Sequence, residues 1–191
     1  MRLFTGIDLP EDVIDVFERL LVRFRPAANL KWVPAYNLHI TAKFIGEWQE
    51  ARLPELSEVL AKTPPRPPIK IDLRTLGWFP NARRPRVFWV GVEGGPELVE
   101  LAHDIDRALE PLGIAKETRP FAPHLTLARI KQPVPLDKLH HMIESLESTE
   151  VASFQADRFY LYRSQPGSAG SIYTKLSEFR FADAPVTVSH R

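Results

Sequence analysis

The sequence predicts an α+β protein built as two pseudo-symmetric lobes of mainly antiparallel sheet, with helices outside and a central cleft. Strand-like and helix-like segments alternate, and the second half of the chain repeats the order of the first without its opening strand. The pattern His-x-Thr occurs once in each half, at residues 39–41 and 124–126, both times in a strand-like segment. We therefore expect residues 1–191 to form a single domain of two intimate lobes.

Seven segments are predicted to be strands because they alternate apolar with polar residues or are rich in β-branched and apolar residues. In chain order they are residues 3–7, 38–45, 69–74, 87–92, 124–130, 151–162 and 171–181. Turn-forming residues 80–85 and 165–170 separate the third strand from the fourth and the sixth from the seventh.

Four segments are predicted to be helices because apolar residues recur at helical spacing. In chain order these apolar stripes lie in residues 13–24, 53–60, 98–112 and 136–146. Asp8 and Glu11 have the spacing of a capping box before the first helix, and Pro26 should end that helix. Gly113 should end the third helix, and the proline-rich residues 63–68 should form a stiff, extended connector.

The composition is typical of a soluble globular protein and narrows the chemistry. With 191 residues, 44% hydrophobic and 26% charged, the chain can bury a sizeable core. It has no cysteine, which excludes a disulfide framework, a thiolate metal site and a cysteine nucleophile. A net charge of +1 argues against a protein that coats nucleic acid, so an RNA substrate would be gripped at an end. Neither a signal peptide nor a membrane span is predicted, and we expect a cytoplasmic monomer.

The two His-x-Thr patterns each place an imidazole beside a hydroxyl, because residues two apart in a strand point to the same face. One such pattern is more often a histidine on a sheet face than a site, but two in matching strands indicate a shared pocket. That set suits a phosphate ester and requires no metal. His39 and His124 on opposite sides of phosphorus would allow in-line displacement, and Thr41 and Thr126 would donate hydroxyls to the non-bridging oxygens.

Histidine can act as an acid or a base near neutral pH. We assign His39 as the proton donor and His124 as the proton acceptor. The near-symmetry of the two lobes leaves the opposite assignment open.

Further residues are candidates for binding substrate. Lys43, four residues after His39, should share its face and is a candidate for the mouth of the cleft, although an exposed lysine at a sheet edge is the favoured interpretation. Arg129, five residues after His124, would reach phosphate only where the strand ends or bulges, and otherwise would form a structural ion pair. Core packing is the default for any one aromatic ring, and we expect one or two to stack on a base; the candidates are Tyr36, Phe44, Phe121, Tyr162 and Tyr173.

The other clustered basic residues and the other histidines are not expected to belong to the catalytic site. The cluster Arg83-Arg84-Pro85-Arg86 is expected to be a solvated loop, with contact to a phosphate backbone as the alternative. The remaining histidines lack a paired hydroxyl and are expected to be non-catalytic: His103, His140, His141 and His190.

Stretches around both patterns and elsewhere in the chain carry a family resemblance. They are residues 2–10, 32–34, 37–46, 79–80, 84–87, 119–129 and 161–164, and Tyr173. Through them the chain resembles the two-histidine phosphoesterase superfamily, and within it the RNA 2′,3′-cyclic phosphodiesterases, also called 2′-5′ RNA ligases. Ala42 departs from the family's more usual leucine, which should alter packing rather than chemistry.

The resemblance implies a bilobal fold with pseudo-twofold symmetry and a cleft that holds both His-x-Thr pairs. It implies metal-independent hydrolysis of a terminal 2′,3′-cyclic phosphate to a 2′-phosphate, with no cofactor. The implied partners are RNA 3′ ends or small nucleotides with a cyclic phosphate, and no membrane. Some relatives also join RNA ends through a 2′-5′ linkage.

Three alternatives stay open. The same site could act on 2′-5′ oligonucleotides or cyclic nucleotides instead. The cleft could belong to a non-catalytic module that binds nucleotides or RNA ends. A metal phosphodiesterase is the weakest alternative, because the histidines are scattered and have no convincing ligand spacing.

Overall fold

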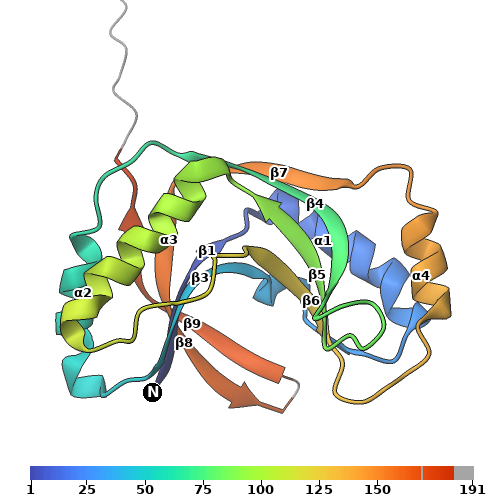
Figure 1. The fold of residues 1–191 in the computed structure, drawn as a ribbon, viewed down its shortest axis with the longest axis horizontal. Helices are drawn as coiled ribbons and strands as arrows, with labels where there is room; N and C mark the ends of the chain where they lie inside the picture. The colour runs from blue at the N-terminus through green and yellow to red at the C-terminus, as the bar shows by residue number, and fades with distance from the viewer. Residues whose placement is uncertain (169, 183–191) are drawn as a thin grey trace, which may run out of the picture.

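In the computed structural model, which describes residues 1–168 and 170–182, the chain forms two antiparallel sheets with helices outside them (Figure 1). The four-stranded sheet has the order β3-β1-β8-β9, and the five-stranded sheet has the order β2-β6-β5-β4-β7. The strands of the four-stranded sheet are β1 (Arg2–Asp8), β3 (His39–Glu47), β8 (Arg158–Gly167) and β9 (Gly170–Arg180). Those of the five-stranded sheet are β2 (Lys31–Trp32), β4 (Ile69–Phe79), β5 (Val87–Glu93), β6 (His124–Arg129) and β7 (Glu150–Ala156). The predicted α+β fold is confirmed.

The two sheets share the chain in an interleaved way. The four-stranded sheet takes the first, third and last two strands, whereas the five-stranded sheet takes the second strand and the four central ones. β1 lies between β3 and β8, so Gly6 faces Thr41 on one side and Tyr160 on the other. The repeated order of elements along the sequence therefore does not correspond to one sheet for each half of the chain.

The prediction of a single strand over residues 151–162 is wrong. This segment forms two strands, β7 and β8, which belong to different sheets and separate at Asp157. Apolar residues such as Phe154 and Phe159 continue on both sides of the break, so periodicity does not mark it. Nor does periodicity predict β2, which is only two residues long. The expected turn over residues 165–170 is shorter than predicted. β8 continues to Gly167, and β9 already begins at Gly170.

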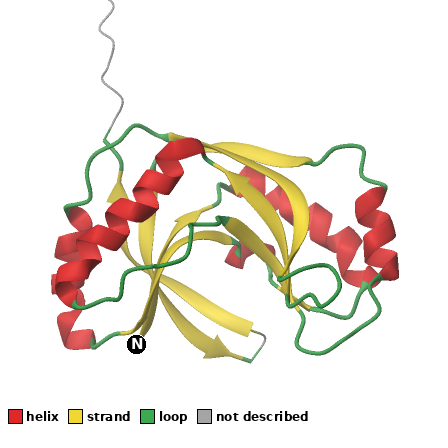
Figure 2. Ribbon diagram, viewed as in Figure 1, coloured by secondary structure: helices red, strands yellow, loops and turns green. Residues whose placement is uncertain are grey.

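Helices cover the outside of both sheets (Figure 2). α2 (Leu53–Ala61) and α3 (Gly95–Leu109) pack on each other, and they contact β9 and β3 respectively. α1 (Glu11–Phe24) packs against β7, and α4 (Asp137–Glu144) places His140 against Trp78 of β4. Single-turn 3-10 helices span Arg25–Ala27, Ala35–Asn37, Glu50–Arg52 and Glu110–Leu112. None of the helices in the described ranges is long and apolar enough to cross a membrane.

The first helix begins differently from the prediction that Asp8 caps it. Pro10 is the N-cap residue, and no side chain supplies a capping hydrogen bond. The carbonyl of Pro10 accepts the first helical hydrogen bond, from the backbone N–H of Ile14 at 2.9 Å. Asp8 instead ends β1 and pairs with Lys175 of β9. The helix ends at Phe24 as Pro26 predicts.

The core follows the predicted apolar pattern and fixes the facing of the two His-x-Thr strands. Ile40 and Leu125, the middle residues of the two patterns, are both fully buried. Because neighbouring side chains in a strand alternate, their burial turns the flanking histidines and threonines toward the opposite side. α3 ends at Leu109, and Gly113 caps the 3-10 helix Glu110–Leu112 that follows it, in the left-handed conformation with φ 81° that suits a glycine.

Candidate active site

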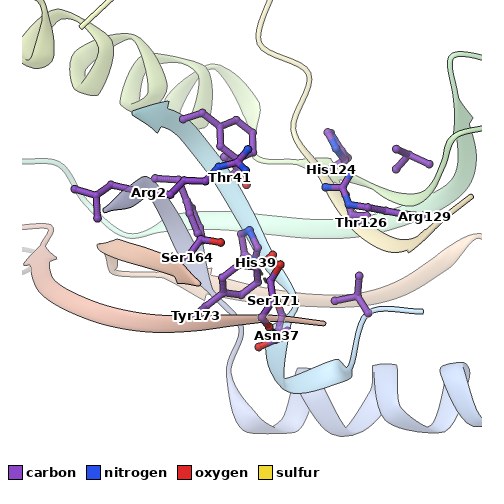
Figure 3. A pocket seen from close by; sticks show the side chains of 15 residues that line it. Arg2, Asn37, His39, Thr41, His124, Thr126, Arg129, Ser164, Ser171 and Tyr173 are labelled. Atoms are coloured by element: carbon purple, nitrogen blue, oxygen red, sulfur yellow. Dashed lines mark hydrogen bonds between the residues drawn. The ribbon is translucent and has the colours of Figure 1, made fainter. Parts of the chain in front are cut away.

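A cavity of about 460 Å³ lies between the two sheets and brings both His-x-Thr pairs together (Figure 3). His39 and Thr41 reach it from β3, and His124 and Thr126 reach it from β6. The other lining residues are Arg2, Leu3, Phe4, Val33, Asn37, Phe44, Val87, Arg129, Ser164, Ser171 and Tyr173. The structure thus assembles the four residues singled out by the repeated pattern.

β6 contains an extra residue just after its pattern. Thr126 and Ala128 face consecutive residues of β5, so Leu127 is skipped in the ladder. Leu127 and Ala128 are both fully buried although they are neighbours, which is the change of phase that a β-bulge produces. Arg129, at an odd offset from His124, is consequently turned into the cavity.

β3 contains the same irregularity at the equivalent place. Thr41 and Lys43 face consecutive residues of β1, so Ala42 is skipped. Phe44, five residues after His39, therefore lines the cavity and occupies the position equivalent to the arginine of β6.

Lys43 faces away from this cavity, so the prediction that it shares the face of His39 is wrong. The bulge at Ala42 reverses the facing that a four-residue spacing would give. The side chain of Lys43 is only 8% exposed, its Nζ is 2.5 Å from the Asp106 carboxylate, and it donates to the carbonyl oxygen of Ala115 at 2.7 Å. The alternative of an exposed lysine at a sheet edge is also wrong.

Both histidines are held in the same orientation by a backbone carbonyl two residues earlier, just before the strand begins. Nδ1 of His39 lies 2.8 Å from the carbonyl oxygen of Asn37, and Nδ1 of His124 lies 2.8 Å from that of Ala122. A carbonyl oxygen only accepts, so each Nδ1 carries a hydrogen and each Nε2 is the nitrogen that faces a ligand. A neutral ring can then accept a proton at Nε2, and a charged ring can donate one from it.

An aromatic ring meets each imidazole at nearly a right angle. Tyr173 lies 4.9 Å from His39 at 82°, and Phe79 lies 5.0 Å from His124 at 83°, measured between ring centroids and planes. Phe4 packs against His39 as well, at 4.7 Å. These contacts fix the position of both rings and keep water from part of their surface.

Burial lowers the pKa of His39 below its ordinary value. The hydrogen bond to Asn37 and the negative charge of Asp8 oppose this effect, while the positive charge of Arg129 adds to it. The open cavity therefore favours the neutral form of His39. An anionic phosphate in the cavity would raise the pKa again, because a negative charge stabilises the imidazolium.

The two threonines and Arg129 offer hydrogen-bond donors to the cavity. Within residues 1–168 and 170–182, neither threonine hydroxyl has a hydrogen-bond partner, and the guanidinium has no carboxylate within 4.0 Å. The alternative of a structural ion pair for Arg129 is therefore not formed in this part of the chain. All three donors are therefore free for a ligand as far as the described residues are concerned.

The aromatic candidates divide between several places. Phe44, 63% exposed, and Tyr173 line the cavity. Phe121 lies in an adjoining cavity of about 480 Å³ that shares Thr41, Phe44 and His124 with the first. Phe44 and Tyr173 are thus the two predicted rings within reach of a ligand at the His-x-Thr pairs.

Tyr36 and Tyr162 lie behind His39 rather than in the cavity itself. Both line another cavity of about 380 Å³, which shares Asn37, His39 and Tyr173 with the main cavity. Tyr36 is 74% exposed, but Tyr162 is only 4% exposed and stacks on Phe4 at 4.9 Å. Burial raises the pKa of the Tyr162 hydroxyl. Because its ring face is occupied, Tyr162 does not offer a stacking surface to a base.

The other predicted features that the structure describes do not line the main cavity. His103 lines the adjoining cavity, His140 packs on Trp78, and His141 is exposed on α4. His190 lies outside the described residues. The loop Arg83-Arg84-Pro85-Arg86 is largely exposed. The backbone N–H groups of Arg83 and Arg84 donate to the side-chain oxygen of Asn81, which fixes the start of the loop.

Several lining residues escape prediction from the sequence. Arg2 and Ser164 face each other across β1 and β8, and Ser171 comes from β9. No local pattern marks these positions, since each reaches the cavity through pairing between distant strands. Asn37 could have been found from the sequence, because it stands two residues before His39 and its carbonyl oxygen bonds to the imidazole. Its side chain donates to the carbonyl oxygen of Ser171 at 2.8 Å.

Acidic and histidine side chains do not gather into a metal site in the part of the chain that the structure describes. No group of three or more of them, within residues 1–168 and 170–182, has an arrangement that could hold a metal ion.

Comparison with known proteins places the chain in a family. Residues 10–167 match the model of the 2′-5′ RNA ligase superfamily. An RNA 2′,3′-cyclic phosphodiesterase of Methanocaldococcus jannaschii is 37% identical, over 94% of this chain and 100% of its own length. A protein of the same name from Methanothermobacter thermautotrophicus is 36% identical, over 94% of this chain and 98% of its own length.

Solved structures agree with the sequence comparison. The crystal structure of TT0787 from Thermus thermophilus superimposes with a TM-score of 0.79 at 31% identity, over 95% of this chain and 98% of the other. That of Escherichia coli LigT complexed with 3′-AMP gives a TM-score of 0.73 at 28% identity, over 94% and 97%. With the matching family model, the matching relatives and the shared fold, the chain belongs to the 2′-5′ RNA ligase superfamily, whose members are two-histidine phosphoesterases.

Proposed function

We propose that this protein hydrolyses the terminal 2′,3′-cyclic phosphate of RNA to a 2′-phosphate without a metal ion. One observation carries the proposal: two histidines, each with Nδ1 bonded to a carbonyl oxygen, line one cavity from two different sheets. The names of the relatives support it, since both archaeal proteins are called RNA 2′,3′-cyclic phosphodiesterases.

The reaction needs a base for water, an acid for the leaving ribose oxygen and donors for the phosphoryl oxygens. In our proposal His124 accepts a proton from water as the water oxygen bonds to phosphorus. The bond between phosphorus and O3′ breaks, and His39 donates a proton to O3′. The products are a 2′-phosphate and a 3′-hydroxyl. His39 and His124 end with their protonation states exchanged, and solvent restores them.

The lowered pKa of His39 bears on this assignment of acid and base. A donor must hold its proton when the reaction begins, and the open cavity favours neutral His39. The assignment therefore requires the bound phosphate to raise the pKa of His39. The opposite assignment, with His39 as base, does not require this step, and the pH profiles of histidine variants distinguish the two.

Thr41, Thr126 and Arg129 support charge stabilisation in the proposal. Both hydroxyls and the guanidinium line the cavity, and none has a protein partner in the described ranges. Hydroxyl donors fit the two non-bridging oxygens, and the guanidinium fits the negative charge that they carry. Phe44 and Tyr173 are proposed to contact the terminal nucleoside.

The experiment that tests the function uses wild-type protein and a short RNA ending in a 2′,3′-cyclic phosphate, in the presence of EDTA. We expect turnover, with the phosphate of the product on the 2′ oxygen. A panel with a 2′-5′-linked oligonucleotide and a 2′,3′-cyclic mononucleotide ranks the substrates by kcat/KM. Activity that EDTA abolishes and a divalent metal restores would contradict the mechanism.

Nucleotides form a second proposed substrate class. Structures of Escherichia coli LigT are complexed with 3′-AMP and with ATP, so a protein of this fold accommodates nucleotides. We propose that small nucleotides with a cyclic phosphate also enter the cleft.

We further propose that the protein works as a cytoplasmic monomer. Analytical ultracentrifugation would test the oligomeric state, and fractionation of cells would test the location.

A further inference from the structure

A basic groove opens directly from the main cavity. It has a volume of about 470 Å³ and shares Arg2, Ser164 and Ser171 with the cavity that holds the histidines. Lys31 and Arg163 line it further out. We call this groove, with its cations Arg2, Lys31 and Arg163, the basic groove.

The cations of the basic groove are not neutralised by any residue that the structure describes. Within residues 1–168 and 170–182, none of Arg2, Lys31 and Arg163 has a carboxylate within 4.0 Å. The one acidic residue on its rim, Glu47, is 3.5 Å from the N-terminal ammonium group. The groove therefore carries a net positive charge at neutral pH.

Strand pairing concentrates this charge further. Lys31 of β2 lies directly opposite Arg129 of β6, and Arg129 lines the main cavity. Like charges opposite each other destabilise a sheet. An anion near both would relieve the repulsion, so the pair suits a ligand with negative charges on both sides of the passage from cavity to groove.

Two other cavities that share residues with the main cavity have their cations paired within the part of the chain that the structure describes. In the adjoining cavity, Lys43 pairs with Asp106 at 2.5 Å and Arg119 pairs with Glu117 at 3.4 Å. In the cavity behind His39, Lys175 pairs with Asp8. Of these three cavities that share residues with the main cavity, the basic groove alone offers cations without carboxylate partners in the described ranges.

We propose that the basic groove binds the phosphodiester backbone of the RNA strand upstream of the cyclic phosphate. This inference rests on the proposed function. With the cyclic phosphate between the histidines, the rest of the strand must leave the cavity on one side, and its phosphates need positive charge. Arg2 stands at the junction, and Lys31 and Arg163 bind the backbone beyond it. The groove thereby makes an RNA strand a better substrate than a mononucleotide.

The test uses the double variant Lys31→Gln/Arg163→Gln, whose two residues do not line the main cavity. The charge-matched control is Arg19→Gln/Lys138→Gln, which removes two exposed cations from α1 and α4. For each protein, kcat/KM is measured on a hexanucleotide ending in a cyclic phosphate and on a cyclic mononucleotide. Binding of a labelled hexanucleotide with a 2′-phosphate end is measured by fluorescence anisotropy over a range of salt concentrations.

Loss of two backbone contacts should flatten the slope of log affinity against log salt by about 1.4, since each contact to single-stranded nucleic acid contributes about 0.7. Affinity for the hexanucleotide should fall roughly tenfold or more at about 0.1 M salt. The ratio of kcat/KM for hexanucleotide over mononucleotide should fall by a similar factor. The control should keep the wild-type slope and ratio.

An unchanged slope in the groove variant, or an equal change in the control, would overturn the inference. The anisotropy measurement does not need turnover, so it decides about the groove even if the protein hydrolyses neither substrate. Absence of turnover on both substrates would contradict the proposed function instead. If wild-type protein hydrolysed both substrates with no preference for the hexanucleotide, the inference about the basic groove would be overturned, but the proposed function would not.

Discussion

Arg129 and Phe44 occupy equivalent positions in the cleft, each five residues after a histidine and each turned inward by a one-residue bulge. In a regular strand, this odd offset would place both side chains on the face opposite the histidine. The two bulges therefore give the cleft one charged wall and one aromatic wall. The charged wall fits a phosphate, and the aromatic wall fits a base or ribose.

Replacing Arg129 should weaken catalysis without unfolding the protein, because the exposed guanidinium has no carboxylate partner in the described ranges. We expect Arg129→Gln to lower kcat/KM on a cyclic-phosphate substrate by about 10–100-fold, since a charge-assisted contact to phosphate is lost. Arg129→Lys should recover part of the activity. If Arg129→Gln had both the thermal stability and the activity of the wild-type protein, Arg129 would have no role in binding the phosphate.

The threonine hydroxyls should matter for rate rather than for folding. Thr41→Val and Thr126→Val keep the shape of the side chain and remove its donor, so kcat should fall by about 10²–10³-fold if each donor stabilises the developing charge. Thr41→Ser and Thr126→Ser should retain most activity. Steady-state kinetics measures kcat for all four variants, and urea unfolding measures their stability. Valine variants with wild-type kcat would contradict the role of the hydroxyls as donors to the phosphate.

The pH profile should reveal which histidine donates the proton. If His39 is the donor, its charged form is lost as pH rises, so His39 should be responsible for the alkaline limb of kcat/KM, and burial, which lowers its pKa, favours that loss. His39→Ala should then lose the alkaline limb and keep the acidic one, and His124→Ala should do the reverse. Loss of the acidic limb in His39→Ala would exchange the two roles.

The buried ion pair between Lys43 and Asp106 should stabilise the fold. Asp106 also accepts hydrogen bonds from the backbone N–H of Glu117, so it ties the segment before the second histidine to α3. We expect Lys43→Met to lower the free energy of unfolding by about 3–5 kcal/mol, because it leaves a buried carboxylate unpaired. Lys43→Met/Asp106→Leu should recover part of this loss.

A matched control separates burial from charge. Lys62 pairs with Glu58 on the surface of α2, with both side chains more than two-thirds exposed. Lys62→Met should cost less than about 1 kcal/mol in urea unfolding. Equal losses in Lys43→Met and Lys62→Met would contradict the structural role of the buried pair.

The sequence predicts the centre of the site because that centre depends only on the two-residue period of a strand. His39 and Thr41 share a face for this reason, and so do His124 and Thr126. The periphery depends on features without a local signal. The bulge at Ala42 decides the facing of Lys43, and no spacing rule reveals an extra residue.

Long-range pairing sets the rest of the fold and the site. Arg2 enters the cavity because β1 pairs with β8, more than a hundred and fifty residues away in sequence. The division of residues 151–162 between two sheets follows from the same kind of pairing. Apolar periodicity marks that a strand exists, but it does not name the neighbour of that strand.

The most direct test of the central claim compares wild-type protein, His39→Ala and His124→Ala in single-turnover hydrolysis of an RNA ending in a 2′,3′-cyclic phosphate, with EDTA present. Circular dichroism and RNA binding serve as controls for folding and for an intact cleft. The account predicts that each variant binds the RNA and forms the 2′-phosphate product about 10²–10⁴-fold more slowly. A rate near that of wild type in either variant would contradict it.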